Sequence, residues 1–369
     1  MKIEHDEKFT LRGLSEKESK NLSVFGLIRS KGLISRTDLS KDTGINIVSI
    51  SNYVKDFIIK GLLYESGFET SSGGRKPELV EISSKDASVM GIHIDQSEAT
   101  VTICGLGGNL IEKKKVPVSE AFGAGEAIVK AVNSGAAKIK AIGLVSSDDH
   151  APSGSAVSSI AASLGNSLKV PVFSGNAIYA AAFAEKFYND KTSPSDLLYV
   201  HSGLGACVAA KNFELLSYTD NPKEDTKYLR PWGQRLSARK MARAEVEKGV
   251  GTSIVRIAGA DIKNITEEVV IEASKQGDGV ASGIIESIGV NLGLRIAYLV
   301  NIFAPKTVII AGGIEKAEEI ILPGIKKMVS MLGKKELSKN LIIKSSVLGK
   351  DGAALGAAAL AVRELFIRS

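Results

Sequence analysis

The sequence predicts an α/β protein with a small helical amino-terminal domain and a larger domain of alternating strands and helices. Within residues 1–83, three helix-capping patterns precede apolar residues at helical spacing, and two short strand-like runs follow them. Beyond residue 84, strand-like apolar runs repeatedly end in glycine-rich loops. We therefore predict one domain at 1–83 and a second at 84–369.

The composition is that of an ordinary folded protein. Of the 369 residues, 44% are hydrophobic and 24% are charged. We find no apolar run near the roughly 20 residues that span a bilayer, and the terminus MKIEHDEKFTLRG lacks the apolar centre of a signal peptide. We expect a cytoplasmic protein without a membrane partner.

The cysteines do not indicate a disulfide framework or a metal site. Cys104 and Cys207 each lie in a small apolar stretch, and neither belongs to a CxxC pair. We expect two buried thiols, no bound metal and no cofactor.

The net charge does not by itself indicate a nucleic-acid partner. The chain carries +6, but residues 1–83 hold 13 Lys and Arg against 12 Asp and Glu, a difference of +1. Attraction to phosphate depends on local patches, so the placement of individual side chains has to decide the matter.

Three short helices are predicted at the amino terminus. A capping box at residues 15–18 begins the first helix, which ends near Gly32. Ser35 caps the second, which stops at Gly44, and Asn46 caps the third. The residues of the third helix expected to pack inward are Ile47, Ile50, Val54, Phe57 and Ile58.

Two short helices joined by a glycine-containing turn form a helix-turn-helix, whose second helix enters the major groove of DNA. Asn46, Ser49 and Asn52 offer amide and hydroxyl groups to base edges. The alternative is a module that binds only other proteins. The helix residues predicted to contact DNA are Ser35, Arg36, Asn46, Val48, Ser49, Ser51, Asn52 and Lys55.

A β-hairpin after the helices completes a predicted winged helix. Leu62–Tyr64 and Leu79–Ile82 have strand character, and the loop SSGGRKP lies between them at 71–77. The glycines permit close approach, so Arg75 and Lys76 are expected to enter the minor groove. The wing residues predicted to contact DNA are Gly74, Arg75 and Lys76.

Residues 33–82 resemble the amino-terminal domain of ROK family repressors (repressors, open reading frames, kinases). The resemblance covers LISRTDLSKDTGINIVSISNYVKDFIIKGLLYESG and the basic wing SSGGRKPELVEI. It implies a sequence-specific transcriptional regulator, acting as a repressor, that binds a double-stranded DNA operator. Such proteins are expected to pair as a homodimer or a dimer of dimers, matching two operator half-sites.

The larger domain shows an α/β pattern. GIHIDQSEATVTICGLGGNLIEKKKVPV, from Gly91, predicts a hairpin with Gly-Gly-Asn as its turn. Strands are also predicted at 171–173, before Asn176 and a helix, at 197–200, before the loop Ser-Gly-Leu-Gly, and at 307–310, before Gly-Gly. Strands that end in glycine loops are typical of an α/β domain.

Residues 88–369 resemble the ROK branch of the actin-like, hexokinase-like ATPase fold. GDGVASGIIESIGVNLGLRIAYLVNIFAPKTVIIAGGIEKA at 277–317 is similar to the family's long helix and the glycine strand on its adenosine side. DGAALGAAALAV, from Asp351, resembles the family's closing helix. The resemblance implies two lobes, the second at about 187–350.

The kinase residues of the family are altered in this chain. Where family kinases have approximately Asp-Ile-Gly-Gly-Thr-Lys, residues 93–98 read His-Ile-Asp-Gln-Ser-Glu, without the glycines that let amides approach phosphate. The family's Asn-Asp pair, whose Asp is the catalytic base, is Asn176-Ala177 here. Alanine cannot accept a proton, so the resemblance implies no catalysis. The family's CxCGxxGC zinc motif has no counterpart.

For several residues, the sequence leaves open whether they bind a ligand. The loop at 202–205 is either a relic turn or a phosphate cradle, and Trp232 either stacks on a ligand or packs in the protein. Asp148 and Asp149 are expected in a solvated turn, and His93 and His201 are expected to be structural. The possible ligand residues are Asn176, Ser202, Gly203, Gly205, Gly312 and Gly313.

Three functions are compatible with these patterns. A DNA-binding regulator with an inactive, kinase-like domain that senses a sugar or sugar-derived effector fits all of them. An active carbohydrate kinase with a DNA-binding domain is opposed by Ala177 and the lost glycines. The third possible function is a DNA-binding regulator whose large domain is only an oligomerisation scaffold.

Overall fold

The computed structural model describes most of the chain. The described residues are 7–10, 13–68, 78–83, 87–95, 98–117, 124–132, 138–146, 154–188, 197–201, 205–209, 215–216 and 237–369. They divide into two units, the first comprising Met1–Asn189, Asn212–Leu215 and Asp351–Ser369, and the second Asp190–Lys211 and Leu216–Lys350.

The three amino-terminal helices form where the sequence predicts them. They are α1 (Glu16–Lys31), α2 (Arg36–Thr43) and α3 (Ile47–Ile59). The side chains of Ser15, Ser35 and Asn46 each accept a hydrogen bond from a backbone N–H in the first turn of the helix that follows. Gly44 ends α2 at a φ of 71°, a conformation that glycine adopts without strain.

An antiparallel sheet completes this part of the first unit. It contains β2 (Ile34–Ser35), β3 (Leu63–Phe68) and β4 (Glu78–Ile82) in the order β2-β4-β3. Helices followed by such a hairpin have the element order of a winged helix. The prediction that Ile47 packs inward is wrong, because this residue is 45% exposed at the start of α3. The buried apolar residues of α3 are Ile50, Val54 and Phe57.

A six-stranded sheet forms the centre of the first unit. Its order is β1-β9-β8-β5-β6-β7, with β7 and β6 antiparallel to their neighbours and the rest parallel. The predicted Gly-Gly-Asn turn joins β6 to β7. The strands are β1 (Glu7–Lys8), β5 (Ser88–Ile94), β6 (Glu98–Gly105), β7 (Leu110–Pro117), β8 (Ile139–Ser146) and β9 (Val172–Asn176).

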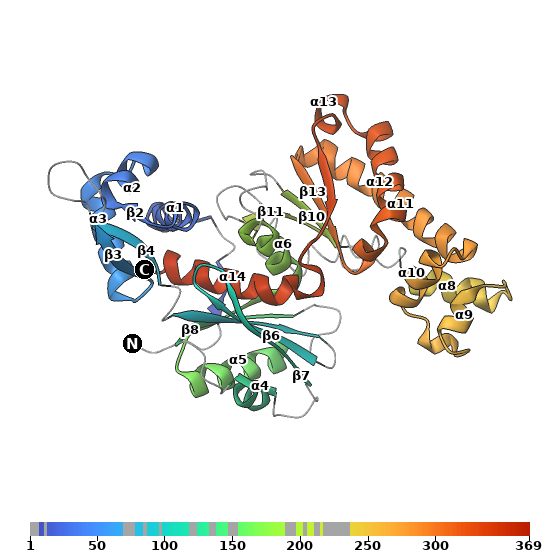
Figure 1. The fold of residues 1–369 in the computed structure, drawn as a ribbon, viewed down its shortest axis with the longest axis horizontal. Coiled ribbons are helices and arrows are strands. Elements are labelled where there is room, and N and C mark those ends of the chain that lie inside the picture. Colours follow the sequence, from blue (N-terminus) through green and yellow to red (C-terminus); the bar gives the residue numbers. More distant parts are fainter. Residues whose placement is uncertain are drawn as a thin grey trace. The chain divides into compact units, whose positions relative to one another are not determined.

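Helices cover both faces of this sheet (Figure 1). On one face lies α14 (Gly352–Ile367), with α6 (Ala177–Tyr188) against it; α4 (Ala124–Val132) and α5 (Gly154–Leu168) pack on the other. Glycines allow the close contact of α14. A Cβ at Gly143 would lie 2.0 Å from the Ala357 carbonyl oxygen, and one at Gly356 would lie 1.8 Å from that of Ala180.

The second unit is built on the mixed sheet β12-β11-β10-β13-β14. Its long helix α11 (Gly279–Phe303) packs on α12 (Glu318–Leu332) and α10 (Glu267–Lys275), and the buried residues of these helices form one apolar core. The strands are β10 (Leu197–His201), β11 (Gly205–Ala209), β12 (Leu215–Leu216), β13 (Thr307–Ala311) and β14 (Ile342–Ser345). Among the smaller helices are α8 (Ala238–Glu247), α9 (Ser253–Ile257) and α13 (Lys335–Ser338).

Helix α11 is long and apolar enough to cross a membrane by length and composition alone. We expected no segment of such length and apolar composition, and α11 is an exception. Just over half of its most apolar window, 56%, is buried inside the protein, and α11 is part of the apolar core of the second unit. A core helix has these properties, so the segment is only weak evidence for a membrane span.

Candidate functional site

The outer face of α3 presents several of the predicted DNA-contacting side chains. Asn46, Val48, Asn52 and Lys55 are exposed, and Ser49 is half-buried. The opposite face is fixed by the buried residues of α3, so the orientation of this surface follows from the core. Amide, hydroxyl and ammonium groups on one exposed helix face are suited to base edges and phosphates.

Four predicted residues form contacts inside the protein. Ser35 is only 1% exposed, and its hydroxyl accepts from the Asp38 N–H and donates to the Asp38 carboxylate. Arg36 forms ion pairs with Glu65 (2.7 Å) and Glu78 (3.3 Å). We therefore remove Ser35 from the DNA-contacting set, because a buried residue cannot reach a duplex. Two others have their contacts inside α3: Asn46 caps it, and Ser51 donates to the Ile47 carbonyl.

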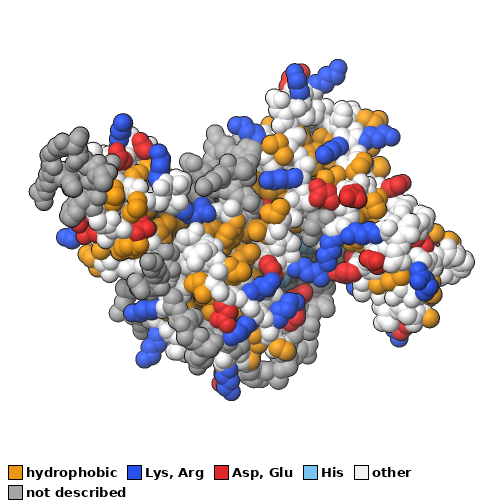
Figure 2. Space-filling view, viewed as in Figure 1, with side chains coloured by type: hydrophobic (Ala, Val, Ile, Leu, Met, Phe, Trp, Pro, Cys, Tyr) orange, Lys and Arg blue, Asp and Glu red, His pale blue; other side chains and the backbone are white. Residues whose placement is uncertain are grey.

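The wing residues Gly74, Arg75 and Lys76 lie outside the described residues, so their predicted contacts remain predictions. Acidic and basic side chains are interspersed over the amino-terminal helices rather than separated (Figure 2). One example is the ion pair between Lys31 and Asp42, at 3.6 Å. The surface thus agrees with the near-neutral charge count of residues 1–83.

An aromatic cluster joins these helices to the carboxyl-terminal helix. The ring of Phe366, at the end of α14, stacks on Phe25 of α1 with centroids 4.2 Å apart, and meets Phe57 of α3 edge-on at 4.9 Å. Phe187, at the end of α6, stacks on Phe25 at 6.5 Å. The Arg29 guanidinium lies 3.8 Å from the Phe187 ring centroid and donates to its carbonyl oxygen. These rings fix α1 and α3 to α6 and α14.

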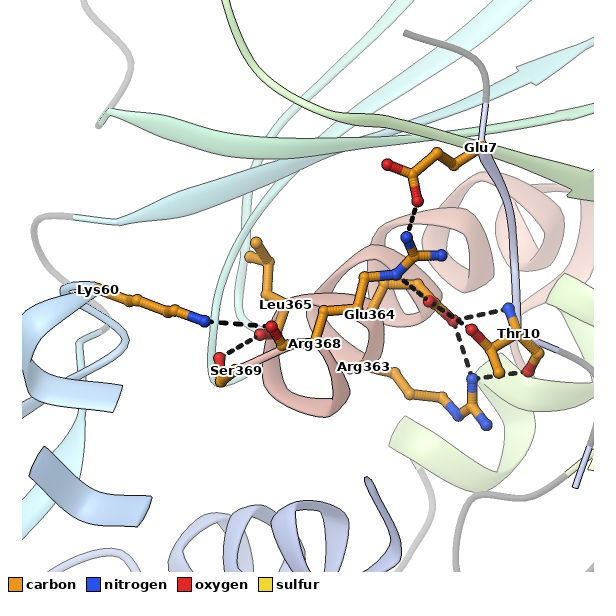
Figure 3. A network of polar contacts seen from close by, with 8 residues as sticks. All are labelled: Glu7, Thr10, Lys60, Arg363, Glu364, Leu365, Arg368 and Ser369. Carbon is orange, nitrogen blue, oxygen red and sulfur yellow. Dashed lines mark hydrogen bonds and ion pairs between the residues drawn. The ribbon is translucent and has the colours of Figure 1, made fainter. Parts of the chain in front are cut away.

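A buried polar network lies beside this cluster (Figure 3). The Glu364 carboxylate accepts hydrogen bonds from the Thr10 N–H and hydroxyl, both at 2.9 Å, and pairs with Arg363 and Arg368. The Arg363 and Glu364 side chains are 2% and 0% exposed. Burial raises the pKa of Glu364, while Arg363 and Thr10 oppose that shift. The network therefore holds the segment before α1 against α14.

Further bonds connect α1 and α3 to the last residues of the chain. The Asn21 amide donates to the carbonyl oxygens of Phe366 and Ser369, and the Lys60 ammonium donates to that of Arg368 at 3.1 Å. Asn21 is 1% exposed, so its two hydrogen bonds are shielded from water, whereas the bond from Lys60 is exposed.

The segment at residues 7–10 also contacts the large-domain sheet. Strand β1 pairs in parallel with β9, and Phe9 donates its N–H to the Ser174 carbonyl. The Phe9 ring packs on Phe173 and lies against Gly175, where a Cβ would be 2.5 Å from the ring. The sequence did not predict this strand, which places part of residues 1–83 in the sheet of the larger domain.

The altered kinase positions have structural roles. Asn176 ends β9, and its side-chain oxygen accepts the Ile178 N–H at 2.7 Å, which caps α6. Ala177, at the position of the family's catalytic base, is buried. At the first loop, Asp95 donates its N–H to the Glu98 carbonyl. Burial lowers the pKa of the His93 imidazole, which favours its neutral form.

The possible ligand residues of the second unit share one sheet edge. His201 pairs with Ala311 across β10 and β13 and with Gly205 across β10 and β11. Gly312 and Gly313 directly follow β13 at φ values of 100° and 95°, which favour glycine. Ser202 and Gly203 lie outside the described residues, as do Trp232, Asp148 and Asp149.

The described part of the chain contains no group of three His, Cys, Asp or Glu side chains that could hold a metal ion. Cys104 is a buried free thiol whose pKa is raised by burial. The side chain of Cys207 lies outside the described residues.

A protein-family model described as ROK family matches residues 248–364. This stretch of the chain is therefore similar to the ROK family. Two relatives extend the similarity to almost the whole chain. The DNA-binding transcriptional dual regulator NagC of Escherichia coli K12 is 25% identical over 95% of this chain and 93% of its own length. The xylose repressor of Caldicellulosiruptor bescii is 25% identical over 95% of this chain and 96% of its own.

Solved structures show the fold. A ROK family transcriptional regulator, described as a homologue of the E. coli MLC protein, covers 95% of this chain and 97% of its own, with a TM-score of 0.74 and 21% identity. A ROK family glucokinase from Streptomyces griseus covers 74% of this chain and 99% of its own, with a TM-score of 0.56 and 19% identity. The larger domain thus has the two-lobed, actin-like ATPase fold predicted from the sequence.

The residues that attach α1 and α3 were missed at the level of sequence. One signal was present: Arg363 and Glu364 interrupt the otherwise apolar run AALGAAALAV-RE-LFI of α14. Charged residues are rarely buried unless they are paired, so two of them inside an apolar helix indicate a partner elsewhere in the chain.

Proposed function

We propose that this protein is a cytoplasmic, sequence-specific DNA-binding transcriptional regulator of the ROK family, with repression as its mode. The observation that carries the proposal is the face of α3 on which Asn52 and Lys55 are exposed while the opposite face is buried. The regulator names of NagC and the xylose repressor support it, since both align with nearly the whole chain. Twofold pairing, as a homodimer or a dimer of dimers, would match two operator half-sites.

The test is selection of bound sequences from random double-stranded DNA, followed by Asn52→Ala. We expect an enriched motif, and a loss of about 1 to 3 kcal/mol at one base position in the variant. Asn291→Ala removes an exposed amide from α11 and is the matched control, with no expected effect on DNA binding. Failure to enrich any motif would refute the function, and an unchanged Asn52→Ala profile would remove this residue from the reading set.

The ROK domain is proposed to act as a sensor without kinase activity. Ala177 cannot serve as a base, and Asn176 is engaged in capping α6. Relatives named for N-acetylglucosamine and xylose point to a sugar or sugar-derived effector. The candidate ligand residues remain Asn176, Gly205, Gly312 and Gly313, with Ser202 and Gly203.

Two connections from Asn176 support a sensor rather than a scaffold. Helix α6 begins directly after Asn176 and ends near Phe187, which contacts α1. Strand β9, which ends at Asn176, pairs with β1, and seven residues, 9–15, separate the end of β1 from the start of α1 at Glu16. A ligand that displaced Asn176 would therefore shift elements that contact the DNA-reading helices.

Melting of the full chain against N-acetylglucosamine, xylose and glucose separates the two roles. A ligand that binds only the folded protein raises the melting temperature. We expect one sugar to raise it and also to change the affinity for the selected duplex. An unchanged melting temperature at saturating concentrations of every sugar would favour the scaffold role.

A further inference from the structure

Two β-branched side chains are exposed at the start of the proposed recognition helix. Ile47 is 45% exposed and Val48 is 67% exposed, whereas Ile50, Val54 and Phe57 of the same helix are buried. Isoleucine and valine are also weaker helix formers than the straight-chain polar residues that usually occupy solvated positions. Neither core packing nor helix propensity accounts for this pair.

The polar groups around this turn are largely engaged within α3. The Asn46 side-chain oxygen accepts the Ser49 N–H at 2.8 Å, and the Ser51 hydroxyl donates to the Ile47 carbonyl at 2.8 Å. The methyl groups of Ile47 and Val48 are therefore prominent among the groups that this turn presents outward.

The electrostatics of the turn favour an anionic partner. The first turn of α3 contains no acidic residue, so the partial positive charge of the helix N-terminus is not offset there. Lys55 is exposed further along the helix, and the nearby Asp42 is paired with Lys31. An apolar pair flanked by positive potential fits the DNA major groove, where the thymine 5-methyl is the apolar group among polar base edges.

We propose that Ile47 and Val48 form a methyl-reading pair that selects thymine in the operator half-site. This inference rests on the proposed DNA binding and adds the chemistry of one contact to it. Burial of a methyl group between these side chains and the 5-methyl of thymine would stabilise the complex by about fourfold in affinity for each methyl group.

Replacement of thymine by deoxyuridine tests the pair, because it removes only the 5-methyl group. Each thymine in the half-site recovered by selection is replaced in turn, and the Kd is measured at one salt concentration. We expect wild-type protein to lose about fourfold in affinity at one or two positions. Val48→Ala should weaken binding to the thymine duplex and abolish the effect of deoxyuridine at one of those positions, and Ile47→Ala should do so at a neighbouring one.

Ile59→Ala is the matched control, because Ile59 is an apolar residue at the opposite end of α3 and is 72% exposed. This variant should keep the full response to deoxyuridine. A selected half-site without thymine, or a response to deoxyuridine that persists in both Val48→Ala and Ile47→Ala, would overturn the inference and leave DNA binding intact. Failure of the selection to yield any motif would instead refute the proposed function.

Discussion

Gly356→Ala tests the packing of α14 on α6, the two helices that contact α1 and α3. The added Cβ would lie 1.8 Å from the Ala180 carbonyl oxygen and 2.2 Å from its carbon. Non-bonded carbon atoms prefer separations of about 3.5 to 4.0 Å, so the two helices would have to move apart by more than about 1 Å. Because the obstacle is backbone and cannot rotate away, we expect a loss near the upper end of the usual overpacking range, about 3 kcal/mol.

Gly283→Ala is the control for helix propensity. Gly283 lies on an exposed position of α11, and a Cβ there would meet nothing within 4 Å. Alanine loses less backbone entropy than glycine in a helix, so this variant should gain about 0.5 to 1 kcal/mol. The same substitution in two helices is thus expected to have opposite signs.

Urea unfolding followed by circular dichroism measures both variants, and the affinity for the selected duplex measures the consequence for function. We expect the urea midpoint to fall for Gly356→Ala and to rise slightly for Gly283→Ala. Loss of the α14–α6 contact should also weaken DNA binding, since α14 and α6 support α1 and α3 through Phe366 and Phe187. Equal or greater stability of Gly356→Ala relative to wild type would refute this account of the packing.

Three further predictions concern the wing, acid stability and catalysis. Arg75→Ala should weaken DNA binding and reduce the slope of log K against log salt by about 1, and an unaltered slope would place the wing away from the DNA. The hydrogen bond from Lys350, with Lys316 nearby, lowers the pKa of Glu268 from its ordinary value of 4.5 to about 2. Its stabilisation is therefore complete above about pH 4.5 and is lost as the pH falls toward 2, so Glu268→Gln should lower the melting temperature at about pH 6 and have little effect at about pH 2.5. Purified protein should not consume ATP with hexoses or amino sugars, because Ala177 replaces the base; ATP turnover that copurifies with the protein would contradict this.

Local signals in the sequence predicted the amino-terminal helices α1, α2 and α3 well. Capping by Ser15, Ser35 and Asn46 depends on residues three positions apart, so the sequence displays it directly. Ile47 was misplaced because helical spacing identifies a face only to within about one residue at a helix end, where packing decides burial. Ser35 was misplaced because one hydroxyl can either cap a helix or contact DNA, and the sequence does not separate these uses.

Several glycines of the large domain have structural roles that the sequence pattern did not predict. Gly312 and Gly313 were noted as loop residues, and their positive φ values explain why glycine is required there. Gly91, Gly143 and Gly356 lie inside regular elements, where glycine lowers stability unless another backbone approaches closely. Gly91 and Gly143 are approached by α14, and Gly356 of α14 is approached by α6. These partners are distant in the sequence, so no local pattern could reveal the contacts.

The attachment of α1 and α3 depends on the same distant helix, α14. Phe25 and Phe366 are brought together by the fold and not by spacing in the sequence, and Thr10 meets Glu364 in the same way. Removal of one partner from a buried ion pair costs about 3 to 5 kcal/mol because it leaves the other charge unpaired. The buried pair Arg363–Glu364 therefore restricts where the segment before α1 can lie. The boundary after residue 83 stays a prediction, and the first unit contains residues on both sides of it. Within that unit, α1 and α3 contact α6 and α14 through aromatic rings. A change in α14 would consequently reach Phe57 of α3 through a single ring contact.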